Sequence, residues 1–490
     1  MSVLNTKFRP ARPCLAVALA VFLTACAVKA PDPAQPPFQI PANFLAASTT
    51  QAGVTQSGPW WHDFKDPSLD QLINAALARN PGLAQAIAQR RIAEAQTRLQ
   101  RADRLPQVGL GLGVTRQRQN LGRIPGLGEA ADGLGGGGSG DTAILTTTSN
   151  AALDVSWELD LWGRLASLSA AAQATYLASD AQLRAMRQSI AAQVAQIYFE
   201  IVHARAQVDL SQRTVASLAE MARQINNRVE EGIVSPADGL LANANLDSAR
   251  AGLEQRNEAL ERALRQLEVL LGQYPSGRMY TAEALPTVPP LPVVGVPAEL
   301  LARRPDIQAA ELTLIGAGYE LAAAKRSFLP SLSLSGSAGY SGERMADLFS
   351  SGNFIWSIAG NILQPIFQGG RLVAQVDIAG AQRDENLHAY AETALNALSE
   401  VETALAVDSQ LLARERALDA SANSAEQAVS VSLNRYLQGI DPFLNVLESQ
   451  QRALDGRSAQ ITAQHARIEN RIALHLALGG GFENDDTREQ

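Results

Sequence analysis

Apolar and polar residues alternate along four stretches of the chain, which is the pattern of β-strands with one apolar face. In residues 108–114 leucine and valine alternate with glycine, and in residues 153–160 apolar residues alternate with acids and serine. Residues 331–340 repeat the alternation with serine, and residues 354–359 do so less regularly. Each predicted strand has about 10 residues, the length that a tilted strand needs to cross a lipid bilayer.

Most of the remaining chain has apolar residues at three- and four-residue spacing, which predicts helices. The first helix is expected to begin at Pro67 with Asp66 as its N-cap, and a second covers about residues 81–104. Residues 164–229 contain neither proline nor glycine, and residues 370–437 are interrupted by a single internal glycine. These two stretches predict helices of unusual length.

The long stretches carry a coiled-coil pattern. In the first, apolar residues follow a 3-4-4-3-4 spacing: Leu183, Met186, Ile190, Val194, Ile197 and Ile201. Each stretch ends in a glycine turn, at residues 232–236 and 439–442, and a shorter helix returns to about Leu271 and Leu478. Helices this long favour a coiled coil or a helical array over a globular enzyme.

The chain is a tandem duplication. The sequence around Arg79-Asn80-Pro81 recurs at Arg303-Arg304-Pro305 with an offset of 224, and Gly163-Arg164-Leu165 recurs at Gly370-Arg371-Leu372 with an offset of 207. The 17 additional residues of the first copy fall where residues 133–140 are rich in glycine, as expected of a surface loop. We therefore expect one repeat at residues 66–285, a second at 286–480, and a tail at 481–490.

The N-terminus has the pattern of a targeting segment. Three cations precede an apolar stretch at residues 15–23, which is too short to span a bilayer. The sequence Leu23-Thr24-Ala25-Cys26 then resembles a bacterial lipobox, which implies a signal peptide at residues 1–25 and lipidation of Cys26. Ala27 follows in place of the aspartate that retains lipoproteins in the inner membrane, so the resemblance implies the outer membrane. Residues 26–65, rich in proline and polar residues at their start, predict a lipid-anchored tether.

Composition excludes several classes of protein. Removal of residues 1–25 with their three cations changes the formal net charge from −8 to −11, and no basic stripe is present, so nucleic acid is not an expected partner. Cys14 lies in the signal, so the mature chain has no cysteine pair for a disulfide or a zinc site. The histidines, at positions 62, 203, 388, 465 and 475, lack the spacing of a metal motif such as H-E-x-x-H. We expect no enzyme activity, no cofactor and no metal.

After Cys26 the sequence has no apolar run long enough for a transmembrane helix, so a membrane crossing would require strands. Four strands per chain cannot close a barrel, because the smallest bacterial barrels have about eight. Two chains would supply eight strands with a filled interior, and three would supply twelve with room for a channel. These considerations leave both alternatives open.

Three motifs in order resemble the outer-membrane efflux protein family of TolC-like channels, within its OprM/NodT lipoprotein branch. They are Trp60-Trp61-x-x-Phe64-x-Asp66-Pro67, the segment 157–163, and Arg303-Arg304-Pro305-Asp306-Ile307. The resemblance implies an α+β membrane protein that forms a homotrimer. A shared 12-stranded β-barrel would lie in outer-membrane lipid, and a long antiparallel α-helical coiled-coil barrel would extend into the periplasm. It also implies a passive exit duct, joined through a periplasmic adaptor protein to an inner-membrane pump of the resistance-nodulation-division type.

The resemblance also implies two groups of site residues. The adaptor would meet the helix tips at Arg228, Gly232, Ile233, Ser235, Arg435, Gly439, Ile440 and Asp441. The pore constriction would involve Glu448, Asn445 and Asp238, although Asn445 stands where the family usually has an aspartate. Two other functions remain open: a duct for protein secretion on the same fold, and a structural coiled-coil lipoprotein that forms no pore.

Overall fold

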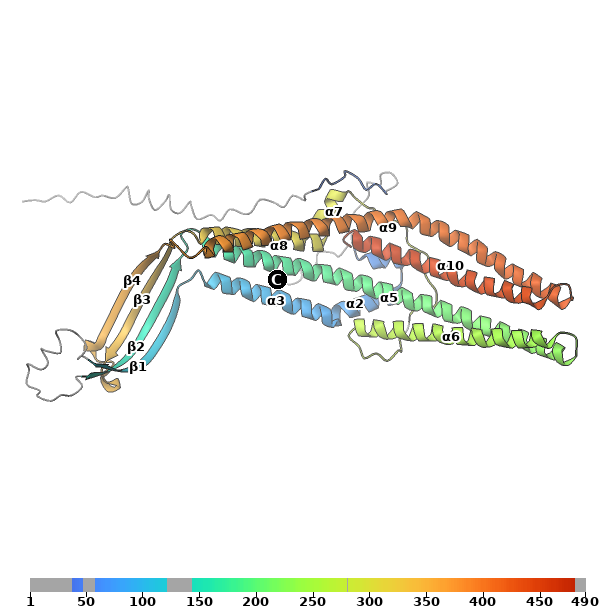
Figure 1. Cartoon of the computed structure of the whole chain (residues 1–490), viewed down its shortest axis with the longest axis horizontal. Helices are drawn as coiled ribbons and strands as arrows, with labels where there is room; N and C mark the ends of the chain where they lie inside the picture. The colour runs from blue at the N-terminus through green and yellow to red at the C-terminus, as the bar shows by residue number, and fades with distance from the viewer. Residues whose placement is uncertain (1–37, 47–57, 121–142, 280, 481–490) are drawn as a thin grey trace, which may run out of the picture. The chain divides into compact units, whose positions relative to one another are not determined.

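The computed structural model describes residues 38–46, 58–120, 143–279 and 281–480. These residues form two compact units (Figure 1). Among the described residues, one unit contains 93–120, 143–176 and 314–386 and includes the strands. The other contains 38–46, 58–92, 177–279, 281–313 and 387–480. Each unit therefore draws on both copies of the duplicated sequence.

The strand-bearing unit holds one antiparallel sheet with the order β1-β2-β3-β4 (Figure 1). Its strands are β1 Gln107–Asn120, β2 Ala143–Leu159, β3 Ser331–Gly342 and β4 Phe354–Leu363. The four predicted strands are confirmed, but the expected length of about 10 residues is wrong for β1, β2 and β3, which have 14, 17 and 12 residues. Strand pairing continues from the apolar part into polar residues as far as Asn120 and Ala143, because backbone hydrogen bonds do not require apolar side chains.

The strand register gathers the apolar residues on one face of the sheet. One row across the four strands contains Leu110, Leu153, Ala338 and Trp356, and its neighbours contain Val108, Val155, Gly336 and Ile358, and Leu112, Ala151, Tyr340 and Phe354. The adjacent row on the opposite face contains Gly109, Asp154, Ser337 and Ser357. The alternation in the sequence thus becomes an apolar face and a small, polar face.

Six of the helices form three pairs of equal length, with one member from each copy. The pairs are α3 Pro81–Ala102 and α8 Pro305–Arg326 with 22 residues, α5 Arg164–Glu230 and α9 Arg371–Leu437 with 67, and α6 Pro236–Leu270 and α10 Phe443–Ala477 with 35. The offsets of 224 and 207 hold at both ends of every pair, which agrees with a tandem duplication. In the described ranges no helix combines the length and the apolar composition needed to cross a bilayer.

The unit that contains no strand among its described residues is called the helical unit below. Its larger apolar core is built on α5. Leu183, Ile190, Val194 and Ile201 of the predicted coiled-coil pattern are buried, and Met186 and Ile197 pack against them. The helix α2 Pro67–Arg79 begins as predicted, with the Asp66 carboxylate accepting from the N–H groups of Ser68 and Leu69. Tyr198 also donates to Asp66, at 2.5 Å, so this N-cap is tied to α5.

Parts of the segment 26–65, which is predicted to be a lipid-anchored tether, pack onto the helical unit. Residues Trp60–Phe64 form a short 3-10 helix whose three large aromatic side chains are buried in the core. Phe44 is buried in a second cluster, and the N–H groups of Leu45 and Ala46 donate to the Glu402 carboxylate at 2.7 and 2.8 Å. Aromatic side chains in a polar segment explain this packing, because each removes a large apolar area from water.

The two copies cap equivalent helix carbonyls, one in α6 and one in α10, with different side chains. Asn80 donates its amide to the carbonyl of Leu270 at 2.7 Å, and Arg304, at the equivalent position, donates its guanidinium to the carbonyl of Ala477 at 3.0 Å. Arg304 is also paired with Asp306 and Glu400, at 2.7 and 2.6 Å. The hydrogen bond to the helix carbonyl is therefore common to both copies, although the residue that donates it differs. A short helix, α7 Pro297–Arg303, precedes Arg304 and was not predicted.

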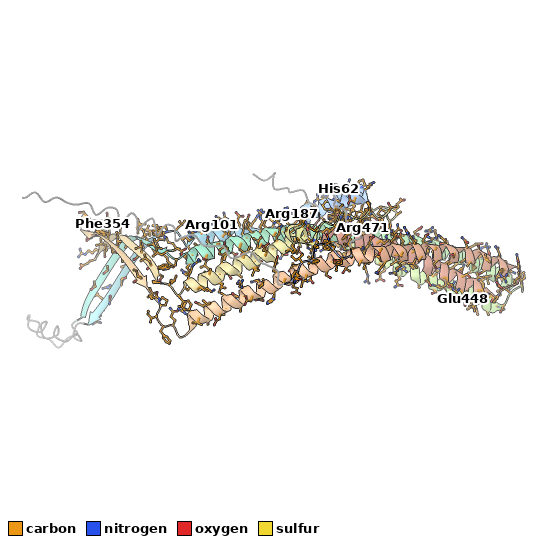
Figure 2. All side chains as sticks on the ribbon, turned by 90° about the horizontal axis from the view of Figure 1, so that it is seen from above. His62, Arg101, Arg187, Phe354, Glu448 and Arg471 are labelled. Carbon is orange, nitrogen blue, oxygen red and sulfur yellow. The ribbon has the colours of Figure 1, made fainter. Side chains whose placement is uncertain are left out.

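Two arginines, one of them buried, hold the connection between the copies. Arg205 of α5 donates to the carbonyls of Met279 and Thr281. Arg471 of α10, 2% exposed, donates to the carbonyl of Pro289 and pairs with Asp408 of α9 at 2.9 Å (Figure 2 shows Arg471). The equivalent pair in the first copy is apolar, because Ile201 and Leu264 stand 207 residues earlier and are both buried.

Candidate functional site

The turns that join α5 to α6 and α9 to α10 have the same backbone geometry (Figure 1). Gly232 and Gly439 have φ values of 72° and 74°, the left-handed conformation that glycine adopts without strain. In both turns the residue after the glycine donates its N–H to the carbonyl five residues earlier, at 2.9 Å. These bonds define a Schellman motif, which fixes the end of each long helix.

The start of each return helix is secured differently. Ser235 caps α6 by accepting from the N–H of Ala237 at 3.2 Å. The second turn has Pro442 at the equivalent position, and there the guanidinium of Arg435 donates to both oxygens of Asp441 at 2.6 and 3.1 Å. Hydrogen bonding from Arg435 lowers the pKa of Asp441. Hydrogen bonds within each turn therefore fix its backbone.

Tyr436 joins the two hairpins at their tips. Its hydroxyl lies 3.4 Å from Oδ2 of Asp238, and the guanidinium of Arg228 lies 5.8 Å from the centre of its ring. Its ring packs against Phe443 in a buried cluster that also contains Ile225. Asp238, predicted at the constriction, thus contacts the other hairpin of its own chain. Sequence analysis missed Tyr436, although an aromatic residue in a stretch rich in Ala, Gln and Leu was a usable signal.

Apolar side chains are exposed around both turns. Ile233 and Ile440 are 58% and 56% exposed and occupy equivalent positions. Leu240, Leu241 and Leu444 on the return helices are exposed as well. Exposed apolar residues gathered on a rigid surface are typical of protein interfaces. The predicted tip residues therefore lie beside exposed apolar side chains on two turns of the same geometry.

The two remaining constriction residues lie on the first two turns of α10. Asn445 and Glu448 are both exposed. Glu448 pairs with Arg452 one turn further along, at 3.4 Å (Figure 2). Exposed pairs of this kind contribute little to stability, so Glu448 is not required to hold its own helix. Cys26, the predicted lipidation site, lies outside the described residues.

The apolar face of the sheet is a second candidate surface. Leu110 and Ile358 are 71% and 78% exposed, and Val108, Leu112, Leu153 and Trp356 are exposed beside them. A large exposed apolar surface marks a contact with lipid or with another protein. The opposite face, with its glycine, serine and aspartate side chains, suits contact with water.

Comparison with known proteins agrees with these features. The family described as "Outer membrane efflux protein" matches residues 72–273 and 296–480. Outer membrane protein OprJ of Pseudomonas aeruginosa is 33% identical over 483 residues, which are 97% of each chain. Cation efflux system protein CusC of Escherichia coli is 30% identical over 484 residues, covering 96% of this chain and all of that protein.

The fold is similar to that of solved channels. The outer-membrane channel OprN superposes with a TM-score of 0.81 at 27% identity, over 92% of this chain and 99% of that one. The matched family segments cover both copies of the duplicated sequence, and the relatives match it from end to end. The chain therefore belongs to the outer membrane efflux protein family.

Proposed function

We propose that this protein is the outer-membrane exit channel of a tripartite efflux pump, which conducts small molecules passively from the pump and its adaptor to the outside. The observation that carries the proposal is the register of the four-stranded sheet. Over the rows from Val108 to Leu112 it places an exposed apolar face opposite a small, polar face. Such a sheet suits a barrel wall with lipid outside and water inside.

The sheet also supports assembly of three chains. In the described part of the chain, β1 and β4 pair on one side only, so the outer edges of the sheet need partners. Each backbone group left unpaired in lipid costs several kcal/mol. A homotrimer would pair these edges in a shared barrel of twelve strands with room for a channel. Native mass spectrometry in mild detergent should give the trimer mass, and a population of monomers and dimers alone would oppose the proposal.

Adjacent residues of β4 provide a matched test of the two faces. Ile358 lies on the apolar face and Ser357 on the polar face. Ile358→Arg should sharply reduce the amount of channel in the outer membrane, because an arginine in the lipid-facing region costs about 2–4 kcal/mol. Ser357→Arg should still assemble and should shift the selectivity of the channel in planar bilayers toward anions. If both variants assemble equally well, the assignment of the faces is wrong.

The helix tips are proposed to bind the periplasmic adaptor, and through it an inner-membrane pump of the resistance-nodulation-division type. The support is the exposed apolar pair Ile233 and Ile440 on two turns of fixed geometry. Ile440→Asp should abolish resistance conferred by the complete pump while leaving the conductance of the purified channel unchanged. Loss of both would indicate a folding defect, and loss of neither would remove the tips from the interface.

Glu448 is proposed to line the aperture, near Asn445. In a trimer three copies of this exposed carboxylate would face one another and favour cations over anions. Glu448→Lys should reduce or reverse the cation preference in planar bilayers, with no change in trimer mass. Arg452→Lys, which retains the charge next to Glu448, is the control. Unchanged selectivity in Glu448→Lys would mean that Glu448 is only a solvated helix residue.

Lipidation of Cys26 is proposed from the lipobox. The mature protein should begin at residue 26 and carry three acyl chains by intact mass, whereas an unmodified N-terminus elsewhere would contradict the assignment. The sheet argues against a structural coiled-coil lipoprotein, since a spacer has no use for four amphipathic strands. A protein-secretion duct is distinguished by its cargo: drug resistance should depend on this protein, and export of proteins should not.

A further inference from the structure

Three ionisable side chains meet where α5 packs against α10, away from the tips and the sheet. Glu200 and His203 lie one turn apart on α5, and His465 comes from α10. The two imidazole rings are stacked with their centres 4.8 Å apart. One ligand atom from each of the three side chains lies within 4.8 Å of the others. The proposed channel function uses none of these residues.

Two nitrogens of the cluster have unsatisfied hydrogen-bonding capacity. His203 Nδ1 and His465 Nε2 are buried and have no hydrogen-bond partner. Both lie 3.6 Å from the same oxygen, Oε2 of Glu200. That distance is too long for a hydrogen bond, but it is close to the separation of about 3.4 Å between ligand atoms around a tetrahedral zinc ion. Burial of unpaired polar atoms is costly, and a shared cation would satisfy all three.

The other ring nitrogens have polar neighbours that can orient the imidazoles. His203 Nε2 lies 3.4 Å from the hydroxyl of Thr462, and His465 Nδ1 lies 3.9 Å from the Glu469 carboxylate. Metal-binding histidines commonly have such neighbours at the second nitrogen. Glu200 is half exposed, which leaves a path for an ion from solvent.

The duplicated frame does not require these residues. The equivalent positions, 207 residues away, hold Val407 for Glu200, Gln410 for His203 and Glu258 for His465. The equivalent helices, α9 for α5 and α6 for α10, form with these other side chains. Packing of the frame therefore does not account for two stacked imidazoles beside a carboxylate.

We propose that Glu200, His203 and His465 bind one zinc ion per chain, with water as the fourth ligand. Two imidazoles and a carboxylate form a ligand set typical of zinc. Because the ligands come from α5 of the first copy and α10 of the second, the ion would link the two copies. The site goes beyond the proposed transport function and does not depend on it.

The test uses the mature full-length chain in detergent, purified with a tag that contains no histidine and stripped of metal with EDTA. Titration calorimetry with zinc chloride, and metal analysis after dialysis, should give one ion per chain. Glu200→Gln and His465→Ala should each weaken zinc binding by at least about tenfold. His388→Ala is the matched control, because His388 is exposed on α9, and it should bind zinc like the parent. Zinc should also raise the melting temperature of the parent and of His388→Ala only.

The half-exposed position of Glu200 keeps the test decisive if His465→Ala fails to fold, because Glu200→Gln changes little volume at the edge of the core. Cobalt(II) provides a second readout: it should give the visible absorption of a tetrahedral site in the parent and lose it in Glu200→Gln. Zinc uptake that is absent in the parent, or equal in the parent and Glu200→Gln, would overturn the proposal. Binding of nickel or copper without zinc would overturn the zinc assignment.

Discussion

Removal of Arg471 should destabilise the helical unit strongly. The substitution Arg471→Leu deletes a side chain that is 2% exposed and leaves the Asp408 carboxylate, its partner at 2.9 Å, without a countercharge. The carbonyl of Pro289 loses its donor as well. Breaking a buried ion pair by removing one partner costs about 3–5 kcal/mol. For a unit of about 300 residues this loss corresponds to a fall of about 5–8 °C in the melting midpoint.

The first copy of the duplicated sequence supplies the compensating change. Ile201 and Leu264 occupy the positions equivalent to Asp408 and Arg471, and both are buried in an apolar cluster. The double variant Asp408→Ile/Arg471→Leu therefore installs a pair that the same frame already accommodates. It removes both charges together, so it should recover most of the lost stability, because replacing a whole buried pair by apolar residues is often neutral or stabilising.

The assay is the melting of the detergent-solubilised protein, followed by circular dichroism at one fixed scan rate, since such unfolding is commonly irreversible. The parent, both single variants and the double variant complete the cycle. Two results would refute the reasoning: an Arg471→Leu midpoint within about 1 °C of the parent, or a double variant no more stable than the less stable single variant.

Two further predictions concern the end of α6, the first by comparison with the end of α10. Gly272 and Gly479 are equivalent, with φ values of 68° and 87°, but a Cβ on Gly272 would lie 2.6 Å from the Arg79 carbonyl, whereas one on Gly479 would have 3.5 Å. Gly479→Ala should lower the free energy of unfolding by about 1–2 kcal/mol, because alanine is strained in the left-handed conformation. Gly272→Ala should lower it distinctly more, because the added Cβ also collides with the Arg79 carbonyl. Thermal melting of both variants tests this, and equal losses of stability would contradict the steric argument. Burial opposes ionisation of Glu268, yet its three donors in residues 276–278, at 2.6–3.2 Å, lower its pKa below the ordinary 4.5. The ionised Glu268 carboxylate therefore stabilises the fold fully above pH 4.5, and this contribution is lost as the pH falls through the lowered pKa. Glu268→Gln should lower the melting midpoint at pH 7, and the difference from the parent should shrink below about pH 4. A difference in melting midpoint that does not change with pH would refute this prediction.

The helices could be predicted closely from the sequence because their limits are set locally. Proline and glycine bound α5 and α9, and the predicted ends lie within one or two residues of the observed Glu230 and Leu437. The strand ends could not be predicted as well. The alternation that revealed them depends on apolar side chains, while pairing continues through polar residues to Ala143 in β2.

Contacts between distant residues could not be predicted from local patterns. Glu200 and His203 have a visible spacing of three residues, but His465 joins them only because α10 packs on α5. The sequence predicted no metal site because the histidines lack the spacing of a metal motif, and spacing describes only residues that are close along the chain. The same limit applies to Asp408 and Arg471, and to Tyr436 with Asp238 at the tips. At the tips, sequence located the turns correctly but not the residue that joins them.

The two caps of the helix ends have an evolutionary consequence. Asn80 and Arg304 each bind an equivalent carbonyl, so selection after duplication preserved the contact and let its chemistry drift. In the second copy the contact is now tied to other side chains. Arg304 also pairs with Asp306 and Glu400, so its replacement by asparagine would leave unpaired two carboxylates whose equivalents in the first copy are Gly82 and Gln193. The residue at this contact can therefore be replaced more easily in the first copy than in the second, where two more side chains depend on it.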